Sequence, residues 1–329
     1  MSFRPHILPS VLCGLLLFLM ILHLNGGDFA LNFGKIWNSL FHFSADNQSD
    51  IIYREIRIPR TVMAILAGAS LSIAGLLMQT LFNNPLAGPS VLGITSGSSL
   101  FVAVTVLTGI SFFNSEWGMV TASLVGAVVF SLVILGFSLF VKSHISLLLI
   151  GMMLGSFSGA LIQVLQTSSQ ASQLKVFTLW GFGSVQHLSF AQIPTVMSVF
   201  LVGVFSLGFL LKPLNLLVIG EKSTQLLGIK TTTFRIWIIV VTSLFTGLVT
   251  AYCGPISFIG LAVPNMVRLL YKTQNHFKLL LGCAFVGAIT LLFCDLLILW
   301  IEPWFNLPLN GITALFGAPV VIWIILKKF

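Results

Sequence analysis

Apolar runs long enough to cross a bilayer follow one another along most of the chain, and this succession limits the fold more than any motif does. Only 7% of the 329 residues are charged, whereas soluble domains carry roughly 25%. An apolar helix of about 20 residues crosses the hydrocarbon core. No polar block between the runs is long enough to build a separate core. We therefore expect an all-α integral membrane protein that forms one transmembrane domain over residues 1–329.

The runs predict about ten crossings. A further run, 254–272, is apolar but shorter, and it contains Pro255 and Pro264. Such a broken helix survives at membrane depth where protein or a water-filled cavity surrounds it. The full-length runs are 8–25, 58–82, 91–112, 117–141, 145–167, 189–211, 234–253, 279–301 and 311–326.

The distribution of charge favours ten crossings over nine. With ten crossings and both termini inside, most Lys and Arg residues fall in inside segments and most acids fall outside. Lys and Arg are enriched in cytoplasmic loops, so both termini are expected in the cytoplasm. The net charge of +8 therefore mainly reflects the orientation of the protein in the membrane, and we do not interpret it as a sign of nucleic-acid binding.

Known catalytic and nucleotide-binding patterns do not occur in the sequence. The stretch GEKST, 220–224, lacks the glycine-rich loop of an ATP-binding motif. The four cysteines show no metal-binding or redox spacing, so we expect no catalytic residue, metal site or cofactor. Asp295 stands nearly alone among the spans, whereas an ion-driven carrier would usually show more ionisable groups there. An ion-coupled secondary carrier and an intramembrane enzyme remain the rival classes.

Segment 212–235 is the longest charged connection on the predicted inside. It is typical of a short amphipathic helix that begins near Glu221 and stops at Gly228, with Leu226 and Leu227 on one side. Two interpretations stay open, namely a solvated turn and a coupling element that fits a groove on a soluble partner.

Five segments together resemble the FecCD family of ABC importer permeases, in order and spacing from about residue 50 to the end. The family serves iron-siderophore, haem and cobalamin uptake. The resemblance implies a type II ABC importer permease of ten transmembrane helices, paired with a second permease that is identical or homologous. It also implies two separate ATPase subunits, an extracytoplasmic binding protein and a place in the bacterial cytoplasmic membrane. The segments are RIPRTVMAILAGASLSIAGLLMQTLFNNPLAGPSVLGITSGSSL (57–100), LWGFGSV (179–185), GEKSTQLLGI (220–229), GPISFIGLAVPNMVRLL (254–270) and LPLNGITALFGAPVVIWIILKK (307–328).

The resemblance implies that this chain moves cargo and hydrolyses no ATP itself. Among the family's cargoes we expect an iron(III)-siderophore, with haem and cobalamin as alternatives. The loop that contacts the ATPases would include Glu221, Lys222, Leu226, Leu227 and Gly228.

The RxPR segment carries the predicted docking site. In the family, arginines here receive carboxylates of the binding protein, and the matching residues are Arg57 and Arg60. Guanidinium groups bind carboxylates in a planar, bidentate manner. The alternative is interfacial anchoring, in which the arginines reach the lipid headgroups. The chain departs from the family at Leu299, which stands where a further arginine is usual.

Two further stretches bear on the pathway. Gly151, Gly155 and Gly159 repeat every four residues, which favours close helix packing; a smooth pathway wall, with Gln163 as a polar point, is the second interpretation. The stretch NNPLAGPS predicts a turn. In the family this turn lies near the inner gate, which assigns Asn83, Asn84 and Pro85 to that gate.

Overall fold

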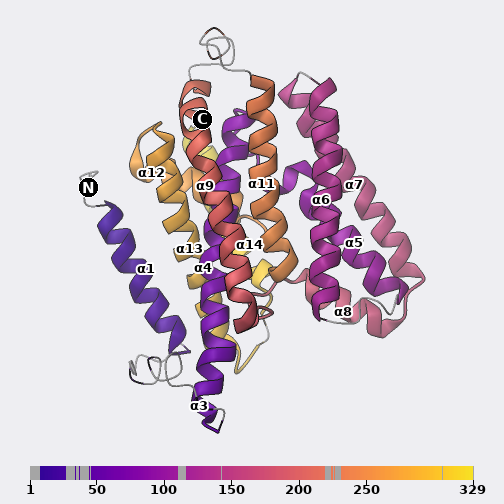
Figure 1. Ribbon diagram of the computed structural model, residues 1–329, viewed down its shortest axis with the longest axis vertical. Coiled ribbons are helices and arrows are strands. Elements are labelled where there is room, and N and C mark those ends of the chain that lie inside the picture. The colour runs from indigo at the N-terminus through magenta and orange to yellow at the C-terminus, as the bar shows by residue number, and fades with distance from the viewer. Residues whose placement is uncertain are drawn as a thin grey trace.

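The computed structural model describes residues 8–26, 34, 37, 44, 46–109, 116–141, 143–218, 224, 226, 231–305 and 307–328, and the described residues form helices and connecting turns. The main helices run nearly parallel or antiparallel in one bundle (Figure 1). They are α1 (Leu8–Leu24), α3 (Gln48–Ile51), η1 (Ile52–Arg57), α4 (Ile58–Leu81), η2 (Pro89–Leu92), α5 (Ile94–Thr108), α6 (Glu116–Phe140), α7 (His144–Thr167), α8 (Ala171–Gly181), η4 (Phe190–Gln192), α9 (Ile193–Leu217), α11 (Thr231–Cys253), α12 (Ile259–Tyr271), α13 (His276–Ile301) and α14 (Leu309–Lys328).

Apolar length sorts these helices into two groups. Within the described chain, 6 helices are long and apolar enough to cross a membrane, and α1, α5, α12 and α14 are shorter apolar helices. The predicted broken run, 254–272, contains α12, which begins only at Ile259. The all-helical fold class is confirmed for the described residues, whereas the count of ten crossings stays a prediction.

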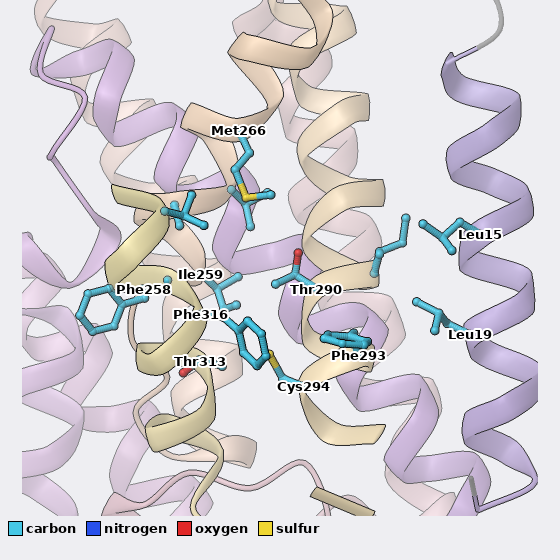
Figure 2. Close-up of a pocket in the computed structure, with 15 residues that line it drawn as sticks. Leu15, Leu19, Phe258, Ile259, Met266, Thr290, Phe293, Cys294, Thr313 and Phe316 are labelled. Atoms are coloured by element: carbon cyan, nitrogen blue, oxygen red, sulfur yellow. The ribbon is translucent and has the colours of Figure 1, made fainter. Parts of the chain in front are cut away.

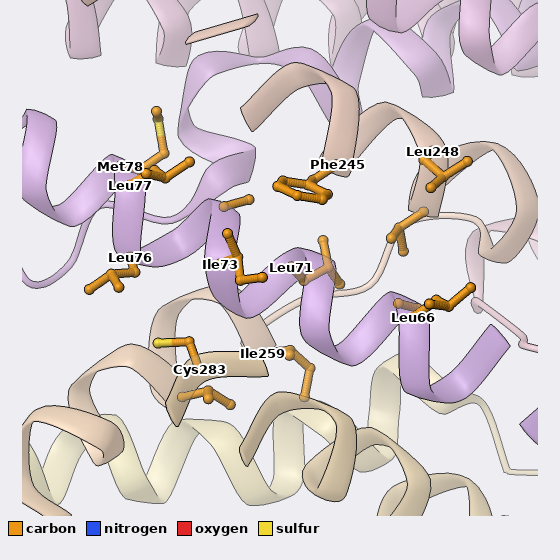
Figure 3. Close-up of a cluster of buried hydrophobic side chains, with 14 of the residues drawn as sticks. Leu66, Leu71, Ile73, Leu76, Leu77, Met78, Phe245, Leu248, Ile259 and Cys283 are labelled. Carbon is orange, nitrogen blue, oxygen red and sulfur yellow. The ribbon is translucent and has the colours of Figure 1, made fainter. Parts of the chain in front are cut away.

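Helix α4 forms the centre of the bundle. It packs against α13, α11 and α12, and its leucines meet Phe245 of α11 and Ile259 of α12 in the buried core (Figure 3). Glycines allow this contact: a Cβ on Gly68 would meet the carbonyl of Gly287, and a Cβ on Gly75 would meet that of Gly260. Small residues at helix crossings bring backbones together where lipid supplies little hydrophobic driving force.

Burial separates the core helices from the outer ones. The most apolar window of the continuous helix Gln48–Leu81 is 89% buried, against 17% for α7 and 22% for α9. Helices α7 and α9 therefore present broad apolar faces to their surroundings, as expected for a protein that lies in lipid.

The bundle has two ends. We call one of them the α3 end; α3, α8 and the start of α4 lie there (Figure 1). We call the other the His276 end; α12 ends and α13 begins there.

Candidate functional site

A buried ion pair ties α4 to α13 at the α3 end. The guanidinium of Arg60 donates to both carboxylate oxygens of Asp295, from Nε to Oδ2 at 2.7 Å and from Nη2 to Oδ1 at 2.9 Å. Arg60 is 6% exposed and Asp295 is 2% exposed. Short, bidentate contacts of this kind are the strongest hydrogen bonds that side chains make. Asp295 is therefore not alone among the spans, because a cation separated from it in sequence pairs with it.

His23 joins the end of α1 to the same pair. Its Nε2 lies 2.7 Å from Oδ2 of Asp295, and its Nδ1 lies 2.7 Å from Oγ1 of Thr61. The Thr61 hydroxyl lies 2.7 Å from the carbonyl oxygen of Arg57, to which it donates. Three helices, α1, α4 and α13, thus meet at one polar cluster, which we call the Arg60–Asp295–His23 cluster.

Two polar side chains border this cluster. Nη1 of Arg60 lies 3.9 Å from a carboxylate oxygen of Glu302, which is half exposed. With its amide oxygen turned toward Arg60, Gln186 accepts from Nη1 at 2.9 Å and Nη2 at 3.1 Å. Asp295, Glu302 and Gln186 also line a cavity of about 240 Å³. The cluster therefore borders an accessible hollow, although its central ion pair is buried.

Arg57, the other predicted docking residue, is half-buried and lies beside the cluster. Its Nη1 donates to the carbonyl oxygen of Leu24 at 3.3 Å, and its guanidinium lies 4.8 Å from the centre of the Tyr53 ring. Arg54 lies 4.7 Å above the Phe190 ring. Docking by Arg57 and Arg60 stays a prediction. The two arginines differ in their partners within the protein, because the guanidinium of Arg60 already binds the carboxylate of Asp295.

The predicted pathway residues occupy different environments along α7. Gly151 is buried against Val91 and Leu92, as helix packing requires, and Gly155 faces Ser96. Gly159 faces open space, because no atom lies within 4 Å of the position that a Cβ would take there, and Gln163 is exposed. The packing interpretation fits Gly151, whereas the pathway interpretation stays a prediction for Gly155, Gly159 and Gln163.

The predicted gate residues form a turn after α4, at the His276 end. Asn83 has a positive φ of 46°, which asparagine tolerates better than most residues. The Asn84 side chain accepts from the backbone N–H of Leu86 at 2.9 Å. Asn265 of α12 donates to the carbonyl of Pro85 at 2.8 Å. The predicted turn is present, and its role as a gate stays a prediction.

Most of the predicted coupling loop lies outside the described residues. This applies to Glu221, Lys222, Leu227 and Gly228, whereas Leu226 is described and is 89% exposed.

An apolar cavity of about 400 Å³ lies between α1, α12, α13 and α14 (Figure 2). Its lining includes Phe293 and Phe316, whose rings pack edge to face at 5.8 Å. The hydroxyls of Thr290 and Thr313 donate to carbonyls of their own helices. The lining thus suits hydrocarbon better than a hydrophilic cargo.

Sequence reasoning missed His23, Thr61 and Gln186. One signal was available: an ionisable residue inside a membrane helix almost always has a partner. Asp295 therefore indicates that a cationic partner lies nearby, but nothing in the local sequence identifies which residues reach it.

The fold and the cluster define a multi-span helical membrane protein in which a buried Arg–Asp pair joins two core helices. A model of the FecCD transport family matches residues 15–327. The chain belongs to this family, and it is an ABC-type permease, a membrane-embedded transport component rather than an enzyme.

Named relatives and a solved structure agree with this assignment. The chain is 35% identical over 291 residues to the vitamin B12 import system permease protein BtuC of Salmonella paratyphi A, a match that covers 85% of each chain. The BtuC of Salmonella typhimurium matches to the same extent. A solved structure described as an inward-facing conformation of a metal-chelate type ABC transporter superimposes with a TM-score of 0.86 at 28% identity, covering 98% of this chain and 100% of that one.

Proposed function

We propose that the protein is the permease subunit of an ATP-driven importer for a large metal-containing cofactor or chelate. The observation that carries this proposal is the match to vitamin B12 permeases along 85% of the chain. The likeness to a metal-chelate type transporter over 98% of the chain supports it.

The named relatives favour a corrinoid such as cobalamin as the cargo. An iron(III)-siderophore, which the sequence led us to expect first, is the second candidate, because the structural neighbour is described only as a metal-chelate transporter. Haem is a third member of the same cargo class. All are delivered whole by a binding protein, so the permease itself needs a wide passage rather than a chelating site.

The proposed assembly has two permeases, two ATPase subunits and one extracytoplasmic binding protein in the bacterial cytoplasmic membrane. The α3 end faces outward and receives the binding protein, and the His276 end, with both termini, faces the cytoplasm. Transport is alternating access between two conformations whose populations nucleotide binding shifts. The loop that contains Leu226 transmits the motion of the ATPases.

An uptake assay tests the choice of cargo. Cells that lack their own cobalamin and siderophore permeases receive this chain with its cognate ATPase and binding protein, and labelled cobalamin, ferric siderophore and haem are offered separately. We expect saturable uptake of cobalamin, which unlabelled cobalamin abolishes and ferric siderophore does not. Uptake of a ferric siderophore alone would transfer the assignment to the second candidate, and uptake of none of the three would contradict the proposal.

A further inference from the structure

At the His276 end, one buried side chain connects three helices. His276, the first residue of α13, is 1% exposed. Its backbone N–H donates to Oδ1 of Asn215 on α9 at 2.8 Å, and its ring Nδ1 lies 3.0 Å from the same oxygen. Its ring Nε2 lies 3.1 Å from Oγ1 of Thr80 on α4. We call these residues the Asn215–His276–Thr80 chain.

The amide oxygen of Asn215 fixes the direction of the hydrogen bond at Nδ1. The amide oxygen of Asn215 can only accept, so Nδ1 of His276 carries a hydrogen and donates to it. Nε2 then faces the hydroxyl of Thr80, which also lies 2.9 Å from the carbonyl oxygen of Leu76. The imidazole therefore adds a polar bridge between α9 and α4, two helices that also pack directly against each other.

Both contacts lie close to the segments that the proposed mechanism moves. Asn215 lies in the last turn of α9, which ends at Leu217 just before the segment that leads to α11. Thr80 lies in the last turn of α4, which ends at Leu81 just before the Asn83–Pro85 turn. His276 thus connects the last turn of α9 to the last turn of α4 by polar contacts, beside the direct packing of the two helices.

The imidazole contacts are not needed to begin α13, although Asn215 also accepts from the backbone N–H of His276 there. Asn275 already caps this helix: its Oδ1 accepts from the backbone N–H of Phe277 at 3.0 Å and of Lys278 at 3.4 Å. A cap of this kind satisfies the N–H groups that a helix start leaves unpaired. The imidazole contacts to Asn215 and Thr80 thus link α13 to α9 and α4.

The neighbouring contacts between α4 and α12 are only partly satisfied. Gln79 donates from Nε2 to the carbonyl of Leu261 at 3.1 Å, but its buried Oε1 has no partner within the described chain. A buried acceptor without a partner costs about 1–3 kcal/mol. Rearranging this interface therefore breaks fewer hydrogen bonds than rearranging a fully hydrogen-bonded interface would.

We infer that His276 is a positioning residue that couples the cytoplasmic end of α9 to the turn at Asn83–Pro85. When the ATPases move the segment after α9, the Asn215–His276–Thr80 chain moves the end of α4 with it. This inference rests on the proposed ATP-driven function.

Paired variants test the inference in proteoliposomes that contain the complete importer. Asn215→Leu removes both contacts from Asn215 to His276, and Thr80→Val removes the contact to Nε2 together with the bond to the Leu76 carbonyl. Asn215→Asp and Thr80→Ser are the matched controls, because each keeps an oxygen in place. Thr290→Val is a further control, since its hydroxyl donates only to Val286 of the same helix. The readout is the amount of cargo moved per ATP hydrolysed, measured beside ATPase activity and thermal stability.

We expect Asn215→Leu and Thr80→Val to lower the cargo moved per ATP about tenfold, within the range of typical couplings between sites. ATPase activity and assembly should remain. Asn215→Asp, Thr80→Ser and Thr290→Val should keep the ratio of the unsubstituted protein. An unchanged ratio in Asn215→Leu and Thr80→Val, or a loss of stability and assembly without uncoupling, would overturn the inference.

A second measurement separates this inference from the proposed function. If the unsubstituted importer moves no cargo with ATP, the proposed function fails. If it does, a spin label at Val218 reports the movement of the end of α9, and a spin label at Leu86 reports the movement of the turn after α4. We expect both labels to shift on nucleotide binding in the unsubstituted protein, and only the Val218 label to shift in Asn215→Leu. Shifts of both labels in Asn215→Leu would contradict the coupling.

Discussion

Asp295 shows how a carboxylate can lie inside an apolar helix. Burying an ion costs several kcal/mol, and a partner repays this cost only when the geometry is good and the remaining hydrogen bonds are made. Asp295 meets both conditions, because Arg60 binds it in bidentate fashion and His23 lies 2.7 Å from one of its oxygens. Removing Arg60 or Asp295 alone takes away the closest charged partner of the other.

The first prediction concerns this ion pair. Asp295→Ala and Arg60→Ala should each lower the free energy of unfolding by about 3–5 kcal/mol, because each strands a buried charge. The double variant should cost less than the sum of the two single costs, because it strands neither charge. Unfolding of the purified protein in detergent measures all three variants.

The same variants distinguish a structural Arg60 from a docking Arg60. If Arg60 served only to bind the partner protein, Arg60→Ala would weaken that binding and leave stability unchanged. Glu302→Ala is the matched control, since Glu302 lies 3.9 Å from Arg60 and is half exposed. It should change stability by no more than about 1 kcal/mol.

The second prediction concerns Arg57. Because its side chain is half-buried rather than enclosed, Arg57→Ala should weaken binding of the binding protein about tenfold, which corresponds to about 1.4 kcal/mol. Arg57→Lys should recover part of the affinity, since a point charge replaces a planar fork. Titration of the binding protein onto the reconstituted permease measures both. Equal affinity for Arg57→Ala and the unsubstituted protein would refute docking through this residue.

At the scale of helices, glycines decide how closely α4 meets its neighbours. The third prediction compares two glycines in long helices. A Cβ on Gly75 would overlap the backbone of Gly260, whereas Gly208 has open space around it. Gly75→Ala should therefore lower the free energy of unfolding by about 1–3 kcal/mol, and Gly208→Ala should leave it unchanged or raise it slightly. A loss at Gly208 as large as that at Gly75 would contradict the packing.

The helices themselves were largely predictable from sequence, because apolar length is a local property. The predicted run 58–82 agrees closely with α4, and 279–301 falls within α13. Contacts between helices were not predictable in the same way. The Arg60–Asp295 pair joins residues that are 235 positions apart, and no local pattern selects one cation among several. The glycine repeat on α7 suggested packing, but only the fold shows that Gly151 packs and Gly159 faces open space.

At the scale of the whole molecule, the fourth prediction concerns orientation. In a variant with Cys13→Ser, Leu226→Cys and Lys175→Cys place one thiol on each side of the membrane. Both positions are exposed in the structure. A membrane-impermeant thiol reagent applied to intact cells should label Lys175→Cys and should label Leu226→Cys only after the cells are opened. The reverse pattern would invert the proposed orientation and place the ATPase contact elsewhere.

The central claim is that a separate motor drives this permease with ATP. The most direct measurement is uptake of labelled cobalamin into proteoliposomes that contain the permease, its ATPase and its binding protein. We predict uptake that requires ATP and stops when the ATPase carries a substitution that abolishes hydrolysis. Uptake by the permease alone under an ion gradient, without the ATPase, would contradict the claim and identify a secondary carrier.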